Sequence, residues 1–177
     1  MMVIWAAVLT VAAMAQVPDK LEPGMPLPEL KGELLTGKKI SLPAQTKGKI
    51  TFLALGFTYD SRFTVEAYAN RFKEEYGNDE HCTFYEVPMI GGMARMGKWF
   101  IESGMRRGTA KNLHEHVMTV YGNPDAWKKA VGYKEANSAY LILLDADGVV
   151  RWMQHGAFQE DRYQQMKQVL RQLLTGS

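Results

Sequence analysis

The alternation of apolar and polar positions predicts a strand, a turn and a helix in direct succession. Residues 50–55 form a continuous apolar run of strand formers, which is typical of a strand buried on both faces. A polar turn follows at residues 58–62. Beyond it, apolar side chains recur at helical spacing: Val65, Tyr68 or Ala69, Phe72 and Tyr76. We expect Asp60 or Ser61 to cap this helix by accepting hydrogen bonds from its free amide groups.

Two further strand patterns flank this unit. Residues 34–42 alternate on either side of a glycine and predict a β-hairpin, after a proline-rich lead-in at residues 17–29. Residues 83–87 predict a second strand, which Pro88 is expected to end. The first helix would then cross over between two parallel strands.

Residues 89–133 are predicted to form a helical insertion. The patterns favour helices at about 95–103 and 109–121, and a short helix at 124–129 that begins after Asn123.

The last part of the chain predicts an antiparallel pair of strands and a closing helix. Strands at 140–144 and 149–153 flank an Asp-Gly turn at 145–148. One face of the C-terminal helix is apolar, with Tyr163, Met166, Leu170 and Leu173. The order of these elements predicts an α/β fold, with a central mixed β-sheet flanked by helices.

Composition narrows the functional classes. The 177 residues are 46% hydrophobic and 23% charged, as in an ordinary globular domain. The net charge of +2, without a run of lysine or arginine, does not favour a nucleic-acid partner. Cys82 is the only cysteine, so the chain can form neither an internal disulfide nor a dithiol redox pair.

Residues 1–15 resemble a cleaved signal peptide. They are apolar, and the small residues Ala13 and Ala15 fit a cleavage site before Gln16, although the usual basic residues before Trp5 are absent. A buried N-terminal helix is the alternative. We therefore expect an exported, for example periplasmic, protein with one domain at residues 16–177.

The order and several motifs resemble the thioredoxin-like superfamily, most closely its TlpA and AhpC/TSA families. The likeness lies in the hairpin at 34–42, the turn at 56–62 and the closing pair at 140–152. It implies a three-layer sandwich in which the turn stands where those families keep their reactive cysteine.

The last third also resembles the mitochondrial ATP synthase assembly-factor family numbered ten. The shared residues are Asn137, the strand at 140–145, Gly148, the pair Arg151-Trp152 and Gly156. This resemblance implies a role in binding or assembling a partner protein.

The active-site turn departs from both redox patterns. Asp60-Ser61-Arg62-Phe63 stands where thioredoxins have Cys-x-x-Cys. Thr58-Tyr59-Asp60-Ser61 stands where peroxiredoxins have Thr-x-x-Cys, with serine in place of the cysteine. Residues 137–139 replace the cis-proline of those families. A serine hydroxyl cannot substitute for a thiolate without a general base. The resemblance therefore implies the fold without the redox activity.

Three chemical alternatives stay open. Cys82 could serve a peroxiredoxin- or TlpA-type oxidoreductase, although a cysteine at a buried strand is usually a small hydrophobic residue. His114 and His116 could bind copper with methionines, although their i, i+2 spacing separates them on a helix; the methionines are Met93, Met96, Met105 and Met118. A hydrolase using Ser61, Asp60 and a histidine lacks the Gly-x-Ser-x-Gly elbow.

Two basic groups are candidates for partner contact. Arg106 and Arg107, with Lys111, form a local cluster that would help docking to an acidic partner or a nearby membrane surface. Arg151 and Trp152 would anchor a protein contact if one of them points outward. We predict a non-redox binding or assembly protein of the cell envelope that needs no cofactor. Its contact surface would combine the turn at 56–62 with Arg151-Trp152.

Overall fold

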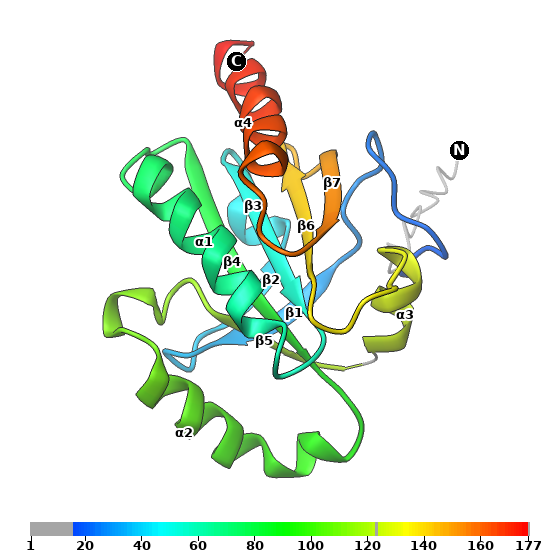
Figure 1. Ribbon diagram of the computed structural model, residues 1–177, viewed down its shortest axis with the longest axis vertical. Coiled ribbons are helices and arrows are strands. Elements are labelled where there is room, and N and C mark those ends of the chain that lie inside the picture. The colour runs from blue at the N-terminus through cyan, green and yellow to red at the C-terminus, as the bar shows by residue number, and fades with distance from the viewer. Residues whose placement is uncertain (1–15, 123, 177) are drawn as a thin grey trace, which may run out of the picture.

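Seven strands form one mixed sheet in the computed structural model, which describes residues 16–122 and 124–176. Their order is β2-β1-β5-β4-β3-β6-β7 (Figure 1). The strands are β1 (Leu30–Leu34), β2 (Lys39–Leu42), β3 (Ile50–Gly56), β4 (Cys82–Ile90), β5 (Met118–Tyr121), β6 (Ala139–Leu144) and β7 (Val150–Gly156). The α-helices are α1 (Arg62–Tyr76), α2 (Lys98–Gly108), α3 (Pro124–Ala130) and α4 (Glu160–Thr175). The predicted signal peptide at residues 1–15 lies outside the described residues.

Strand β3 lies inside the sheet, between β4 and β6, and is buried along its whole length. It pairs in parallel with β4 and antiparallel with β6, so that Leu55 faces Val87 on one side and Tyr140 on the other. The predicted buried strand, the parallel crossover and the antiparallel closing pair are confirmed. The predicted end of the second strand is wrong: Pro88 lies inside β4, in register with Gly56. The strand stays extended beyond it because Met89 and Ile90 pair with β5.

The predicted helix at 109–121 is also wrong. After a short 3-10 turn at Lys111–Leu113 the chain forms β5, which lies between β1 and β4. Its β-branched residues Thr119 and Val120 suit a strand, and both are buried together with Met118. The insertion is therefore helical only in part, and β5 joins the N-terminal hairpin to the central sheet. The other predicted helix of the insertion begins later than expected, at Lys98, after a 3-10 segment at Gly92–Gly97.

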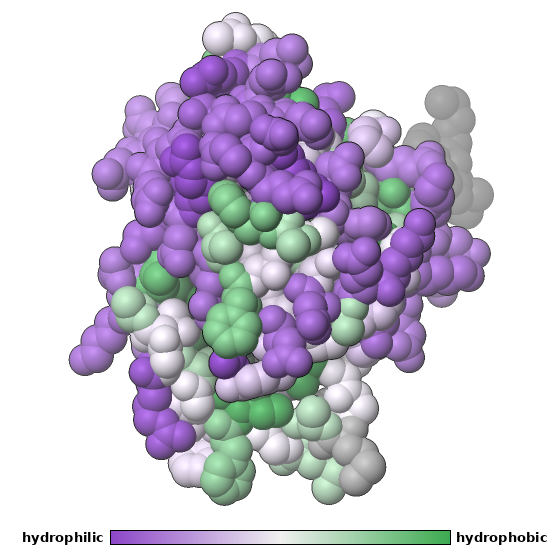
Figure 2. Space-filling view, in the orientation of Figure 1, coloured by the Kyte–Doolittle hydropathy of each residue, from purple (hydrophilic) through white to green (hydrophobic). Residues whose placement is uncertain are grey.

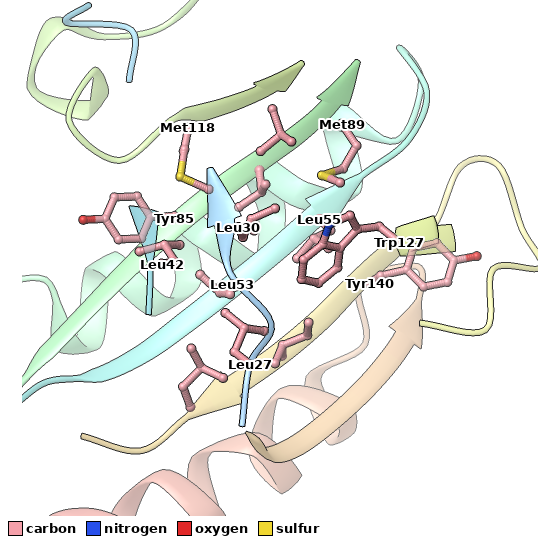
Figure 3. Packing of buried hydrophobic residues seen from close by; sticks show 14 of the residues in the cluster. Leu27, Leu30, Leu42, Leu53, Leu55, Tyr85, Met89, Met118, Trp127 and Tyr140 are labelled. Atoms are coloured by element: carbon pink, nitrogen blue, oxygen red, sulfur yellow. The ribbon is translucent and has the colours of Figure 1, made fainter. Parts of the chain in front are cut away.

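Helices and apolar segments cover the sheet on both faces, which confirms the three-layer α/β sandwich. On one face α1 and α4 pack over a cluster that includes Phe52, Phe72, Leu143 and Tyr163 (Figure 1). On the other face the core is closed by α3 and the N-terminal segment. Figure 3 shows this second cluster; its labelled residues are Leu27, Leu30, Leu42, Leu53, Leu55, Tyr85, Met89, Met118, Trp127 and Tyr140.

Helix α2 is set apart from these two layers. It lies below the sheet in Figure 1. Among the described residues, no helix has the length and apolar character needed to cross a bilayer.

Candidate functional site

The turn between β3 and α1 is closed by reciprocal hydrogen bonds between Thr58 and Ser61. The Thr58 amide donates to Ser61 Oγ at 3.3 Å, the Ser61 amide donates to Thr58 Oγ1 at 3.1 Å, and Ser61 Oγ donates to the Thr58 carbonyl at 2.8 Å. Ser61 is fully buried, and a side chain at Gly56 would lie 2.7 Å from its hydroxyl. The hydroxyl is thus held in place and shielded from solvent.

The predicted helix cap is wrong. Ser61 occupies the N-cap position of α1 with helical backbone angles, and no side chain there accepts a hydrogen bond from the helix amides. A capping serine needs an extended backbone to reach those amides. Here the Ser61 hydroxyl is instead committed to Thr58, while Asp60 is exposed.

Two threonines fasten this turn to the loop before β6. Thr58 Oγ1 donates to the Ala136 carbonyl at 2.7 Å, and Thr64 Oγ1 donates to the Asn137 carbonyl at 2.9 Å. Residues 137–139, which stand where the resembled families have a cis-proline, therefore lie next to the degenerate active-site turn. The two loops form one supported platform.

The outer side of the platform is aromatic and cationic. The Arg62 guanidinium lies 3.7 Å from the ring centroid of Tyr59 and 4.3 Å from that of Phe63. Tyr59 is 76% exposed and Phe63 is 60% exposed. Aromatic and arginine side chains of this kind dominate binding energy in protein interfaces. The sequence prediction missed Phe63 as a surface residue; its signal was an aromatic residue in the first turn of a helix, outside the buried stripe.

Cys82 lies at the opposite end of the sheet from this turn. It pairs with Ile50 at the start of β3, whereas the turn follows Gly56, roughly 20 Å away at about 3.3 Å per residue. Burial raises the pKa of the Cys82 thiol to about 12, and Asp79 raises it further against a smaller opposing effect of Lys49. The thiol is therefore protonated at neutral pH, and it is the thiolate that acts as a nucleophile.

The two histidines of the candidate copper site are each engaged with the backbone. His114 Nε2 lies 3.0 Å from the Thr109 carbonyl, and His116 Nδ1 lies 3.0 Å from the Phe84 carbonyl, with its ring stacked on Phe84. In the part of the chain that the structure describes, no three His, Cys, Asp or Glu residues are grouped to hold a metal ion. Met118 is buried in the core.

The predicted basic cluster is divided by the structure. Arg106 turns inward, where Nε donates to the Leu35 carbonyl at 2.7 Å and Nη2 lies 3.1 Å from Glu102. Arg107 and Lys111 are exposed. Arg106 thus fixes α2 to the domain, whereas the exposed Arg107 is the arginine of this pair whose side chain faces solvent.

The two parts of the predicted contact surface are separated along the sheet. Trp152 faces Leu143, which pairs with Phe52, so it lies four residues along the sheet from Gly56, about 13 Å. Its half-buried side chain packs against the cluster beneath α4. Arg151 is exposed, and its Nε lies 2.6 Å from Asp145. A register shift between β6 and β7 leaves Arg151 without a strand partner.

Comparison with known proteins gives consistent results. The family model described as ATP10 protein matches residues 20–173. A search of curated proteins found no match. The thioredoxin domain of a thiol-disulfide oxidoreductase from Bacteroides vulgatus is 20% identical, with a TM-score of 0.57 over 84% of this chain and 98% of that one.

Two further solved structures are similar. A peroxiredoxin-like protein from Aquifex aeolicus is 15% identical, with a TM-score of 0.54 over 88% of this chain and 92% of that chain. BsSco, a member of the Sco family of cytochrome c oxidase assembly proteins, is 12% identical, with a TM-score of 0.55 over 86% of this chain and 98% of that chain. At such identities these structures establish a shared fold only.

The family match extends from the N-terminal lead-in to the last turns of α4, so it covers nearly all of the domain described above. The resemblance of the closing strands and the thioredoxin-like architecture agree with it. The chain belongs to the ATP10 protein family, on a thioredoxin-like fold with a single cysteine.

Proposed function

We propose that this protein acts in the assembly of another protein in the cell envelope, by binding it without thiol chemistry. The observation that carries the proposal is the state of Ser61. It stands where the resembled oxidoreductases carry a thiol, and it is buried with its hydroxyl committed to Thr58. The only cysteine is protonated and lies at the far end of the sheet.

The binding surface in this proposal is the outer side of the platform, where Tyr59, Arg62 and Phe63 lie. These three side chains are stacked on one another and rest on a turn held by hydrogen bonds. Aromatic side chains have few rotatable bonds, so such a surface binds a partner with little loss of side-chain entropy. Membership of the ATP10 family supports a protein as the partner.

The envelope location rests on residues 1–15. N-terminal sequencing of the protein isolated from cells tests it, with Gln16 as the expected first residue. An intact N-terminus in a cytosolic fraction would refute the location and leave the binding role standing.

Enzyme assays test the absence of thiol chemistry. Wild-type protein and Cys82→Ser are compared for peroxide consumption and for reduction of a disulfide substrate. We expect no turnover from either protein. Turnover that disappears in Cys82→Ser would replace the binding role with an oxidoreductase.

A pull-down from the native envelope tests the platform. The double variant Tyr59→Ala/Phe63→Ala removes two exposed side chains, so we expect an unchanged melting temperature and at least about a tenfold loss of the recovered partner. His81→Ala, exposed at the opposite end of the sheet, is the control. Equal recovery with all three proteins would exclude this surface.

A further inference from the structure

Helix α2 directs polar side chains toward the domain and large aromatic side chains toward solvent. A surface helix normally directs its apolar stripe to the core. Here the one buried residue of the helix is Glu102, while Trp99 is 70% exposed and Phe100 is 75% exposed. The two aromatic rings pack edge to face at 4.9 Å, and Met96, in the preceding turn, is also exposed. Apolar side chains also gather over the lower part of the molecule in Figure 2, where Figure 1 places α2.

The inward face of α2 is polar and tightly paired. Lys98, Glu102 and Arg106 follow one another at four-residue spacing and form one row along the helix. Lys98 Nζ lies 2.7 Å from Glu33 of β1, and Arg106 bonds both Glu102 and the Leu35 carbonyl. These charge-assisted contacts fix the rotation of the helix about its axis, and thereby hold its aromatic residues outward.

The row lies over a buried polar pair. Tyr121 and Glu102 meet there, and Lys98 Nζ lies 3.6 Å from Glu102 Oε1, so burying this charged row in place of apolar side chains costs desolvation energy. Burial and the neighbouring Glu102 raise the pKa of Tyr121. A helix placed for stability alone would bury Trp99 and Phe100 instead. The arrangement indicates that the outward face serves another molecule.

Two glycines indicate what kind of molecule fits. Gly104 and Gly108 lie four residues apart on the exposed side of α2, and a side chain at either position would meet nothing within 4 Å. Glycine weakens a helix relative to alanine, and the fold itself gives no steric reason for it here. Paired small residues at this spacing allow the backbone of a second helix to approach closely.

Other occupants fit this face less well. A lipid surface favours bulky apolar side chains along the whole face, and Gly104 and Gly108 provide no area to insert. A second copy that pairs through the same face of α2 supplies no acidic side chain for Arg107, because the one acidic residue of this helix, Glu102, is buried on its inward side. An acidic side chain on another protein would instead pair with Arg107.

We propose that the outward face of α2 docks an α-helix of the partner protein, apolar where it crosses Gly104 and Gly108 and carrying an acidic residue that meets Arg107. Trp99 and Phe100 pack against the apolar side of that helix. This proposal rests on the proposed function, because it assumes that the partner is a protein.

Site-specific photo-crosslinking in the full chain tests the proposal. A benzophenone side chain replaces Phe100 in one protein and Tyr59 in another, crosslinks are formed in the native envelope, and the captured segment is identified by mass spectrometry. From position 100 we expect capture of a helical segment of another protein that contains Asp or Glu.

Matched variants sharpen the test. Gly104→Leu closes the approach and should lower the crosslink yield from position 100 at least about fivefold. Gln168→Leu adds the same side chain to an exposed position of α4, and should change the yield less than about twofold. Arg107→Glu should also lower the yield, and exchange of the partner's acidic residue for Lys should restore it. Circular dichroism verifies that each variant is folded.

The outcomes separate the two proposals. Crosslinks from position 100 to lipid, to a second copy or to a non-helical segment would overturn the helix-docking inference, as would a yield unaffected by Gly104→Leu. Capture of a protein from position 59 but not from position 100 would overturn it and leave the proposed function intact. Capture from neither position would overturn both.

Discussion

The carboxyl group of Glu86 gives the sharpest test of how this core is built. Glu86 lies in the middle of β4, in register with Ala54 of β3, and is buried. Burial raises the pKa of Glu86 from 4.5 to about 7; repulsion from Glu66 adds to the effect, and Lys73 offsets part of it. The folded protein therefore holds a proton on Glu86 at pH values where the unfolded chain has lost it.

The sign and size of the effect follow from this difference in pKa. The stabilising contribution is fully present below about pH 4.5 and is lost as the pH rises through about 7. At about 1.4 kcal/mol for each pH unit between the two pKa values, the loss amounts to about 3 kcal/mol. Glu86→Gln keeps the shape of the side chain and removes the ionisation.

Urea unfolding of wild type and Glu86→Gln between pH 5 and 8.5 measures the effect. The difference in unfolding free energy between the two proteins cancels most contributions of other titrating groups. Because part of the loss has already occurred at pH 5, we expect Glu86→Gln to gain about 2.5 kcal/mol on wild type between pH 5 and 8.5, which moves its relative urea midpoint by about 1–2.5 M. A difference that stays constant across this range would refute the assignment of a buried, proton-retaining carboxyl group.

Four further predictions concern single side chains. Ser61→Ala leaves the Thr58 amide without its acceptor and should cost about 1–2 kcal/mol in chemical unfolding, with a smaller loss arguing against the closed turn. Trp152→Ala removes packing beneath α4 and should cost about 3 kcal/mol; partner recovery lost without destabilisation would make Trp152 a contact residue instead. Gly104→Ala should raise the stability of the free protein by about 0.5–1 kcal/mol in thermal unfolding, whereas a loss would mean that the fold needs this glycine. Cys82 should react with a thiol reagent only in denaturant at pH 8, and rapid labelling of the native protein would contradict its burial.

Several elements could be predicted from the sequence because their signals are local. The apolar run of β3, the helical spacing of α1 and α4, and the glycine-containing hairpins each depend on residues close together in the chain. The absence of a dithiol pair was evident from the single Cys82. These features determined the fold class and showed that this chain carries no Cys-x-x-Cys pair.

Other features depend on contacts between residues far apart in sequence. Residues 118–121 form β5 because they can pair with both β1 and β4 in the folded sheet. The local sequence pattern contains no information about these two partner strands. Strand register decided that Trp152 lies away from the turn, because each step along a strand moves a residue by about 3.3 Å. The reversed orientation of α2 required Glu33 and the Leu35 carbonyl, more than sixty residues earlier in the chain, to pair with Lys98 and Arg106. Periodicity specifies that a helix has an apolar side, but only the partners brought near by tertiary folding decide whether that side faces the core or the solvent.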